Sequence, residues 1–178
     1  MVRVVLINPP IDCVLENGQA SPVTSYLFYN SAPLGLLYIA SVLEQAEHTV
    51  TAIDGAAEQL NVAKVVQKVV DFAPDVIGIG SFTVSFETTK RLAAELKQAM
   101  PTVPIVLGSY HVTLVPDQAM SDPNFDVGVL GEGEHTMLDL VEHYEHGGEL
   151  SSIPGICFRD ADGTLQFTEK RKKFKALD

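Results

Sequence analysis

Small and polar residues gather directly after four apolar segments of the sequence, in positions where they could contact a ligand. Glycines let a ligand approach the backbone, and hydroxyl groups and free backbone amides offer it hydrogen bonds. One such stretch would be explained by the needs of a turn, but four in equivalent positions favour a binding site. The residues that we expect to form it are Asn8, Pro9 and Pro10, then Ser81, Phe82 and Thr83, then Gly108, Ser109, Tyr110 and His111, and finally Gly131, Glu132 and Gly133.

These stretches do not contain a nucleophile beside a general base, nor a pair of carboxylates, so we predict no catalytic residue and no metal site. His111 is the only histidine among them. It could make a hydrogen bond within a turn, contact a ligand or bind a metal, and these alternatives stay open. Glu134 suits the positive N-terminal end of a helix, whereas Glu132 is the better candidate for a ligand contact. The stretches indicate binding rather than bond making.

The apolar segments that precede these stretches are typical of buried strands. Val4–Ile7, Val76–Ile79, Ile105–Leu107 and Val127–Leu130 are continuous rather than alternating, as in a parallel sheet covered on both faces, and Val50–Ile53 is a weaker fifth. Between them, apolar residues recur with the period of a helix. We therefore predict a doubly wound α/β fold of the Rossmann or flavodoxin-like type. Its five parallel strands have the order 2-1-3-4-5.

The C-terminal part of the chain departs from this alternation. Two strand-like stretches flank the turn sequence Asp160-Ala161-Asp162-Gly163, which is typical of a β-hairpin. In the crossover before the fifth strand, Pro116 and Pro123 allow only a short helix. The expected divisions are an α/β binding domain at 1–148, an appended hairpin at 149–169 and a basic linker at 170–178.

The composition disfavours several classes of function. The chain has 178 residues, and its 23 acidic against 12 basic side chains give a net charge of −11, which opposes binding to nucleic acid or to an anionic membrane. The first residues form a strand-like stretch rather than a signal peptide, and no apolar stretch approaches the roughly 20 residues of a membrane span. We expect a soluble cytoplasmic protein without a nucleic-acid or membrane partner.

Several cofactor and phosphate-binding motifs are absent from the sequence. The first strand is followed by Asn8-Pro9-Pro10 rather than by the G-x-G-x-x-G of dinucleotide-binding domains, and no Walker-type phosphate loop occurs. Asp12 stands alone in that loop, which argues against a phosphorylated receiver domain. The two cysteines, Cys13 and Cys157, are too few and too far apart for an iron–sulfur cluster.

The loops and their order resemble the cobalamin-binding domain at the N-terminus of cobalamin-dependent radical SAM proteins, which include methyltransferases and the anaerobic magnesium-protoporphyrin monomethyl ester cyclases. The resemblance covers almost the whole chain, including the C-terminal hairpin. The matching stretches are LINPP at 6–10, PLGLLYIA at 33–40, DVIGI at 75–79, GSYH at 108–111 and GEGE at 131–134.

The resemblance implies that the chain holds cobalamin at the strand ends, with the nucleotide tail in a groove lined by Ser81, Thr83, Gly108, Ser109 and His111. The D-x-H-x-x-G motif, whose histidine binds cobalt in methionine synthase and the mutases, is absent. The cofactor is therefore expected to be base-off and without a histidine ligand from the loop after the first strand. Whether Cys13 or a water takes the lower position stays open.

The resemblance also implies a longer parent enzyme. Such a parent has a C-terminal radical SAM domain with a 4Fe–4S cluster and S-adenosylmethionine, and it methylates an unactivated carbon or closes a tetrapyrrole ring. The C-x-x-x-C-x-x-C of that domain is absent here, so we expect this chain alone to be a non-catalytic cofactor-binding domain. Two alternatives stay open: a cobalamin-free regulatory or interaction module of the same fold, and a flavodoxin-like binder of a nucleotide.

Overall fold

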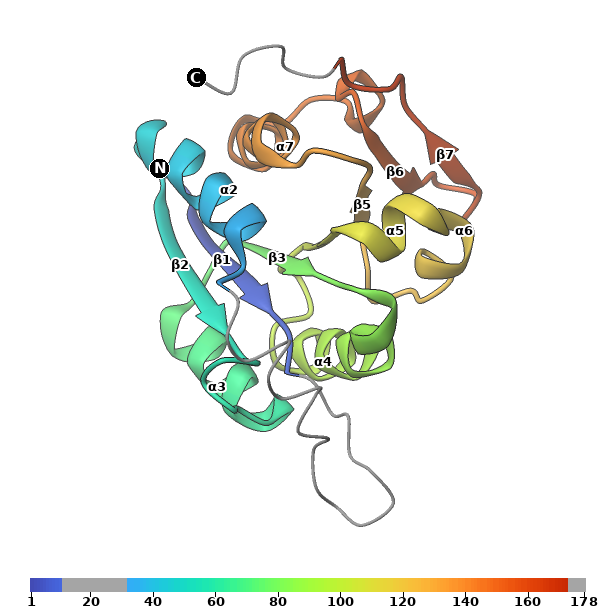
Figure 1. Cartoon of the computed structure of the whole chain (residues 1–178). Helices are drawn as coiled ribbons and strands as arrows, with labels where there is room; N and C mark the ends of the chain where they lie inside the picture. Colours follow the sequence, from blue (N-terminus) through green and yellow to red (C-terminus); the bar gives the residue numbers. More distant parts are fainter. Residues whose placement is uncertain (11–31, 173–178) are drawn as a thin grey trace.

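A computed structural model describes residues 1–10 and 32–172 of the chain (Figure 1). The strands are β1 (Arg3–Asn8), β2 (Thr49–Asp54), β3 (Val76–Gly80), β4 (Ile105–Gly108), β5 (Val127–Val129), β6 (Ile156–Arg159) and β7 (Leu165–Phe167). The helices are α2 (Leu34–Gln45), α3 (Val62–Phe72), α4 (Phe86–Ala99), α5 (Tyr110–Leu114), α6 (Pro116–Ala119) and α7 (Glu134–His146), with 3-10 turns η1 (Thr83–Ser85) and η2 (Leu150–Ser152).

The strands form one mixed sheet in the order β2-β1-β3-β4-β5-β6-β7. The first five pair in parallel, so the predicted doubly wound α/β fold and its order 2-1-3-4-5 are confirmed. The predicted C-terminal hairpin is also present. Its strand β6 pairs antiparallel with β5, so the hairpin extends the same sheet by two strands rather than packing beside it.

Two apolar clusters lie on the two faces of this sheet. Successive residues of β1 point to opposite faces, and Val4 and Leu6 pack in one cluster whereas Val5 and Ile7 pack in the other. Helices α2 and α7 cover the first face, and α3, α4 and the short α5 and α6 cover the second. Because both faces are buried, the strands read as continuous apolar runs.

Helices α5 and α7 begin close after the strands that precede them. Helix α5 begins two residues after β4, and α6 begins at Pro116. Both helices are short, so the prediction of only a short helix in the β4–β5 crossover is confirmed. Helix α7 begins at Glu134, shortly after β5. Over the described residues, the longest helices are too short and too polar to cross a membrane.

Candidate functional site

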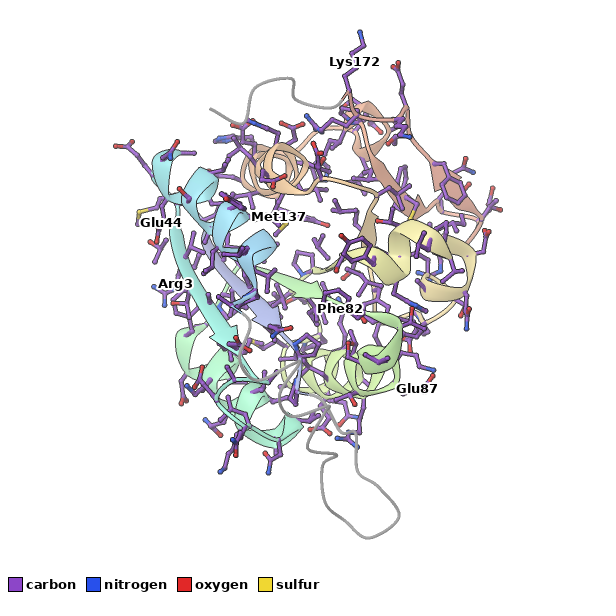
Figure 2. All side chains as sticks on the ribbon, in the orientation of Figure 1. Arg3, Glu44, Phe82, Glu87, Met137 and Lys172 are labelled. Atoms are coloured by element: carbon purple, nitrogen blue, oxygen red, sulfur yellow. The ribbon has the colours of Figure 1, made fainter. Side chains whose placement is uncertain are left out.

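A cavity of about 670 Å³ lies at the edge where β1, β3, β4 and β5 end. Since parallel strands present their carboxyl ends at one edge, the residues at these strand exits lie together there, where open α/β sheets bind their ligands. Much of the wall is apolar. It includes Leu36 and Ile39 of α2, Met137 of α7 and Phe82 of the loop after β3 (the last two labelled in Figure 2).

The structure brings most of the sequence-predicted site residues to this cavity, and it gathers them from all four strand exits. Those that line it are Asn8, Phe82, Gly108, Ser109, Tyr110, Gly131, Glu132 and Gly133. Pro9 and Pro10 are buried beside it. The backbone nitrogen of Pro10 lies so close to Gly55 that a Cβ there would approach it to 2.9 Å.

Ser81, Thr83 and His111 do not line the cavity: Ser81 and His111 are buried, and Thr83 is exposed in η1. The His111 side chain is 3% exposed, and its ring packs on Phe86 with 4.0 Å between the ring centroids. Its Nδ1 lies 3.2 Å from the Thr83 hydroxyl, and its Nε2 has no hydrogen-bond partner among the residues that the structure describes. Burial lowers the pKa of His111, which favours the neutral ring.

Two glycines leave open space at the cavity. A Cβ added to Gly108, at the end of β4, or to Gly131, after β5, would meet no other atom within 4 Å. Gly131 also has a φ of +86°, which a residue with a side chain rarely adopts. A ligand can therefore lie directly against the backbone of both strand exits.

Asn8 is held at the cavity by a residue from the neighbouring strand. Its side-chain nitrogen donates a hydrogen bond of 2.8 Å to the Asp54 carboxylate, which also accepts one of 3.0 Å from the backbone N–H of Ala57. Asp54 ends β2, which pairs with β1 in parallel register, so the two side chains meet at the same edge. We did not predict Asp54 as a site residue, although its position after an apolar run was a usable signal.

The sequence analysis also missed the contributions of α2 and of the C-terminal segment. Residues 33–36 at the start of α2 line the cavity, and so do Lys170, Arg171 and Lys172 (the last labelled in Figure 2). The Arg171 guanidinium donates a hydrogen bond of 2.7 Å to the Thr136 hydroxyl and forms an ion pair with Asp139. These bonds attach the segment after β7 to α7 beside the cavity.

A second hollow, of about 760 Å³, lies between the end of α7 and the β6–β7 hairpin. Three carboxylates line it, from Glu149, Asp160 and Glu169. This hollow is lined by none of the residues at the carboxyl ends of β1, β3, β4 and β5. The cavity at those ends is therefore the better candidate for a cofactor site.

The open doubly wound sheet and the partly apolar cavity at its strand ends define a cofactor- or nucleotide-binding domain of flavodoxin-like architecture. Within this class, residues 21–141 match the profile of the family described as the B12 binding domain. The chain belongs to this family. The resemblance to the cobalamin-binding domain of radical SAM proteins, predicted from the strand-exit loops, is confirmed.

Two relatives of this chain are longer proteins. The chain is 32% identical over 163 residues to an uncharacterized methyltransferase of Pyrococcus horikoshii, covering 90% of this chain and 33% of that protein. It is 30% identical over 161 residues to the anaerobic magnesium-protoporphyrin IX monomethyl ester cyclase of Synechocystis sp., covering 89% of this chain and 31% of the cyclase. This chain therefore spans about a third of the length of these relatives.

The fold is shared with a solved enzyme structure. The radical S-adenosylmethionine methyltransferase TsrM from Kitasatospora setae, with cobalamin and a 4Fe–4S cluster bound, superposes with a TM-score of 0.75 at 17% sequence identity. The match covers 98% of this chain and 30% of TsrM. At this identity the likeness concerns the fold.

Proposed function

We propose that this chain binds cobalamin in the cavity at the strand ends, as the cofactor-binding part of a radical SAM enzyme. The observation that carries the proposal is the open backbone at Gly108 and Gly131, on two strand exits that line the cavity. A bulky planar group requires such a surface, because any side chain larger than hydrogen would occupy the same space.

The lining suits the chemistry of a corrinoid. A corrin has an apolar macrocycle and peripheral amides, and its nucleotide tail ends in a flat base. Leu36, Ile39 and Met137 offer apolar contact, and the polar groups of Asn8 and Ser109 offer hydrogen bonds to amides. We place the tail in the cavity and the macrocycle over the strand ends.

We propose that the cofactor is bound base-off, because a tail held in the cavity keeps its base away from the cobalt, and without a histidine ligand, because no histidine is among the described residues that line the cavity. Asn8 carries an amide, which is a poor donor, and the nitrogens of Pro9 and Pro10 are acylated. His111 is buried, against Phe86 and Thr83. Cys13, the alternative ligand considered from the sequence, lies outside the described residues.

We propose that bond making belongs to another part of a longer protein, a C-terminal radical SAM domain with its own 4Fe–4S cluster and S-adenosylmethionine. Methyl transfer to an unactivated carbon or closure of a tetrapyrrole ring would be the reaction of that parent. Within this chain, we propose the binding domain at 1–148, the hairpin at 149–169 and the linker from 170. Residues 173–178 of the linker lie outside the described part.

Titration of the purified chain with hydroxocobalamin tests this function. We expect a saturable change in the cobalamin absorption spectrum and co-elution of the cofactor with the protein, whereas flavin mononucleotide, added in parallel, stays free. Binding of the flavin instead would support a flavodoxin-like nucleotide binder. Binding of neither would support an interaction module that lacks a cofactor.

A further inference from the structure

Thr113 connects the two strand exits that carry the open glycines. Its hydroxyl donates a hydrogen bond of 2.9 Å to the backbone oxygen of Ser109 and accepts one of 3.1 Å from the backbone N–H of Gly131. A threonine that bonds to the carbonyl four residues earlier is ordinary in a helix. The bond from Gly131 is different, because it comes from the loop after another strand and serves no helix.

Both residues that Thr113 bridges have unusual backbones. Gly131 has a φ of +86°. Ser109 has a φ of +80° and a ψ of −166°, a region that essentially only glycine enters without strain. Such a conformation persists only where its surroundings enforce it. Here the backbone N–H of Ser81 donates a hydrogen bond of 3.0 Å to the backbone oxygen of Gly108, and the Thr113 hydroxyl donates one to the backbone oxygen of Ser109.

The bridge lies at the cavity itself, because Ser109, Thr113 and Gly131 all line it. Thr113 is exposed, so removing its hydroxyl would leave the Gly131 N–H facing solvent rather than buried without a partner. The hydroxyl is therefore not needed for the core.

We propose that Thr113 is a positioning residue that fixes the gap between the exits of β4 and β5 and so shapes the part of the cavity that accepts the nucleotide tail of cobalamin. This inference rests on the proposed function. Both exits lack a side chain at the facing glycines, Gly108 and Gly131, so a flat base would contact backbone there. Contact with backbone depends on loop spacing, which the hydroxyl sets.

Two variants and two ligands test the proposal in the full chain. Thr113→Val keeps the shape of the side chain and loses the hydroxyl, and Thr113→Ser keeps the hydroxyl. The ligands are hydroxocobalamin and cobinamide, which has the same macrocycle without the nucleotide tail. We expect Thr113→Val to raise the hydroxocobalamin dissociation constant about fivefold, because loss of one hydrogen bond lowers by that factor the fraction of loops already in the binding arrangement. Thr113→Ser should retain wild-type affinity, and cobinamide should bind all three proteins equally.

Thermal melting of each variant shows whether it is folded. Unchanged hydroxocobalamin affinity in folded Thr113→Val would overturn the proposal. An equal loss for both ligands would overturn it too, because it would indicate a general structural role rather than a role in placing the tail. If the wild-type chain bound neither ligand, the proposed function itself would fail, and that result is distinct from both of the others.

Discussion

Ser109 has a backbone conformation that its own Cβ disfavours. Replacing it with glycine removes that strain, which costs on the order of 1–3 kcal/mol in folded proteins, and adds some entropy to the unfolded chain. We predict that Ser109→Gly increases the free energy of unfolding by about 1 kcal/mol, as measured by urea denaturation. Ser109→Ala keeps the Cβ and should not gain stability. If Ser109→Gly were no more stable than the wild type, the claim that the Ser109 backbone is strained would be wrong.

His111 makes stability depend on pH. Burial lowers its pKa in the folded state, whereas the unfolded side chain titrates near its ordinary value of about 6.5. Between these two values the unfolded chain binds more protons, so the free energy of unfolding falls as the pH drops through about 6.5. The ring faces Phe86 and Thr83, and the Lys90 ammonium lies over the Phe86 ring, 5.4 Å from its centroid.

Urea denaturation at about pH 7.5 and about pH 5.5 measures this effect. His111→Phe keeps a ring against Phe86 and removes the titrating group. We expect the variant to lose less stability than the wild type between the two pH values. An equal loss in both proteins would assign the pH dependence to other groups.

The buried position of His111 also affects which ligands the cobalt is expected to have. Electron paramagnetic resonance of the cob(II)alamin complex should show no nitrogen superhyperfine splitting, because neither the nucleotide base nor a histidine of the described residues is expected to bind the metal. Splitting from an axial nitrogen would contradict the base-off proposal. Loss of that splitting in His111→Ala would identify His111 as the ligand.

The parallel strands were predictable because both faces of the sheet are covered. That burial makes the four residues Val4–Ile7 all apolar, a pattern that can be seen without a structure. The strand exits followed from the same reasoning, since parallel strands end at one edge. Glycines and polar residues after β4 and β5 therefore pointed to the cavity from the sequence alone.

Other features of the site depend on contacts that no local pattern reveals. Helix α5 begins at Tyr110, so one residue further His111 lies inside, against α4, while Tyr110 lines the cavity. This long-range packing determines which of the two adjacent residues, Tyr110 or His111, points inward. The contribution of Arg171 was equally hidden, because the basic run at 170–175 is typical of a solvated linker.

The segment after β7 is attached to α7 chiefly through Arg171. Its partners are Thr136 and Asp139, and the ion pair is partly exposed, so its contribution to global stability is small, about 0.5 kcal/mol. We predict that Arg171→Ala leaves the thermal unfolding midpoint nearly unchanged but speeds limited proteolysis between residues 165 and 172. Lys172→Ala is the matched control and should be cut at the wild-type rate. Equal rates of proteolysis in the wild type and both variants would contradict the claim that Arg171 attaches this segment to α7.

In the molecule as a whole, the residues that stabilise the fold and the residues proposed to bind the cofactor lie in different places. Two apolar clusters on opposite faces of the sheet hold the fold together, and the carboxyl edge, with its open glycines, is left free for a ligand. This chain corresponds to about a third of the length of relatives named as methyltransferases and cyclases. The proposal that this chain is the cofactor-binding part of a longer protein is consistent with that coverage.

The affinity of Gly108→Val for hydroxocobalamin tests the central claim most directly. Valine suits a strand end, and its Cβ would meet no protein atom within 4 Å, so the fold should persist while the side chain fills the space proposed for the cofactor. Ala99→Val, at the exposed end of α4 on the opposite edge, is the control. Cobalamin binding in the cavity predicts that Gly108→Val loses binding and Ala99→Val keeps it, whereas wild-type affinity in folded Gly108→Val would place the cofactor elsewhere.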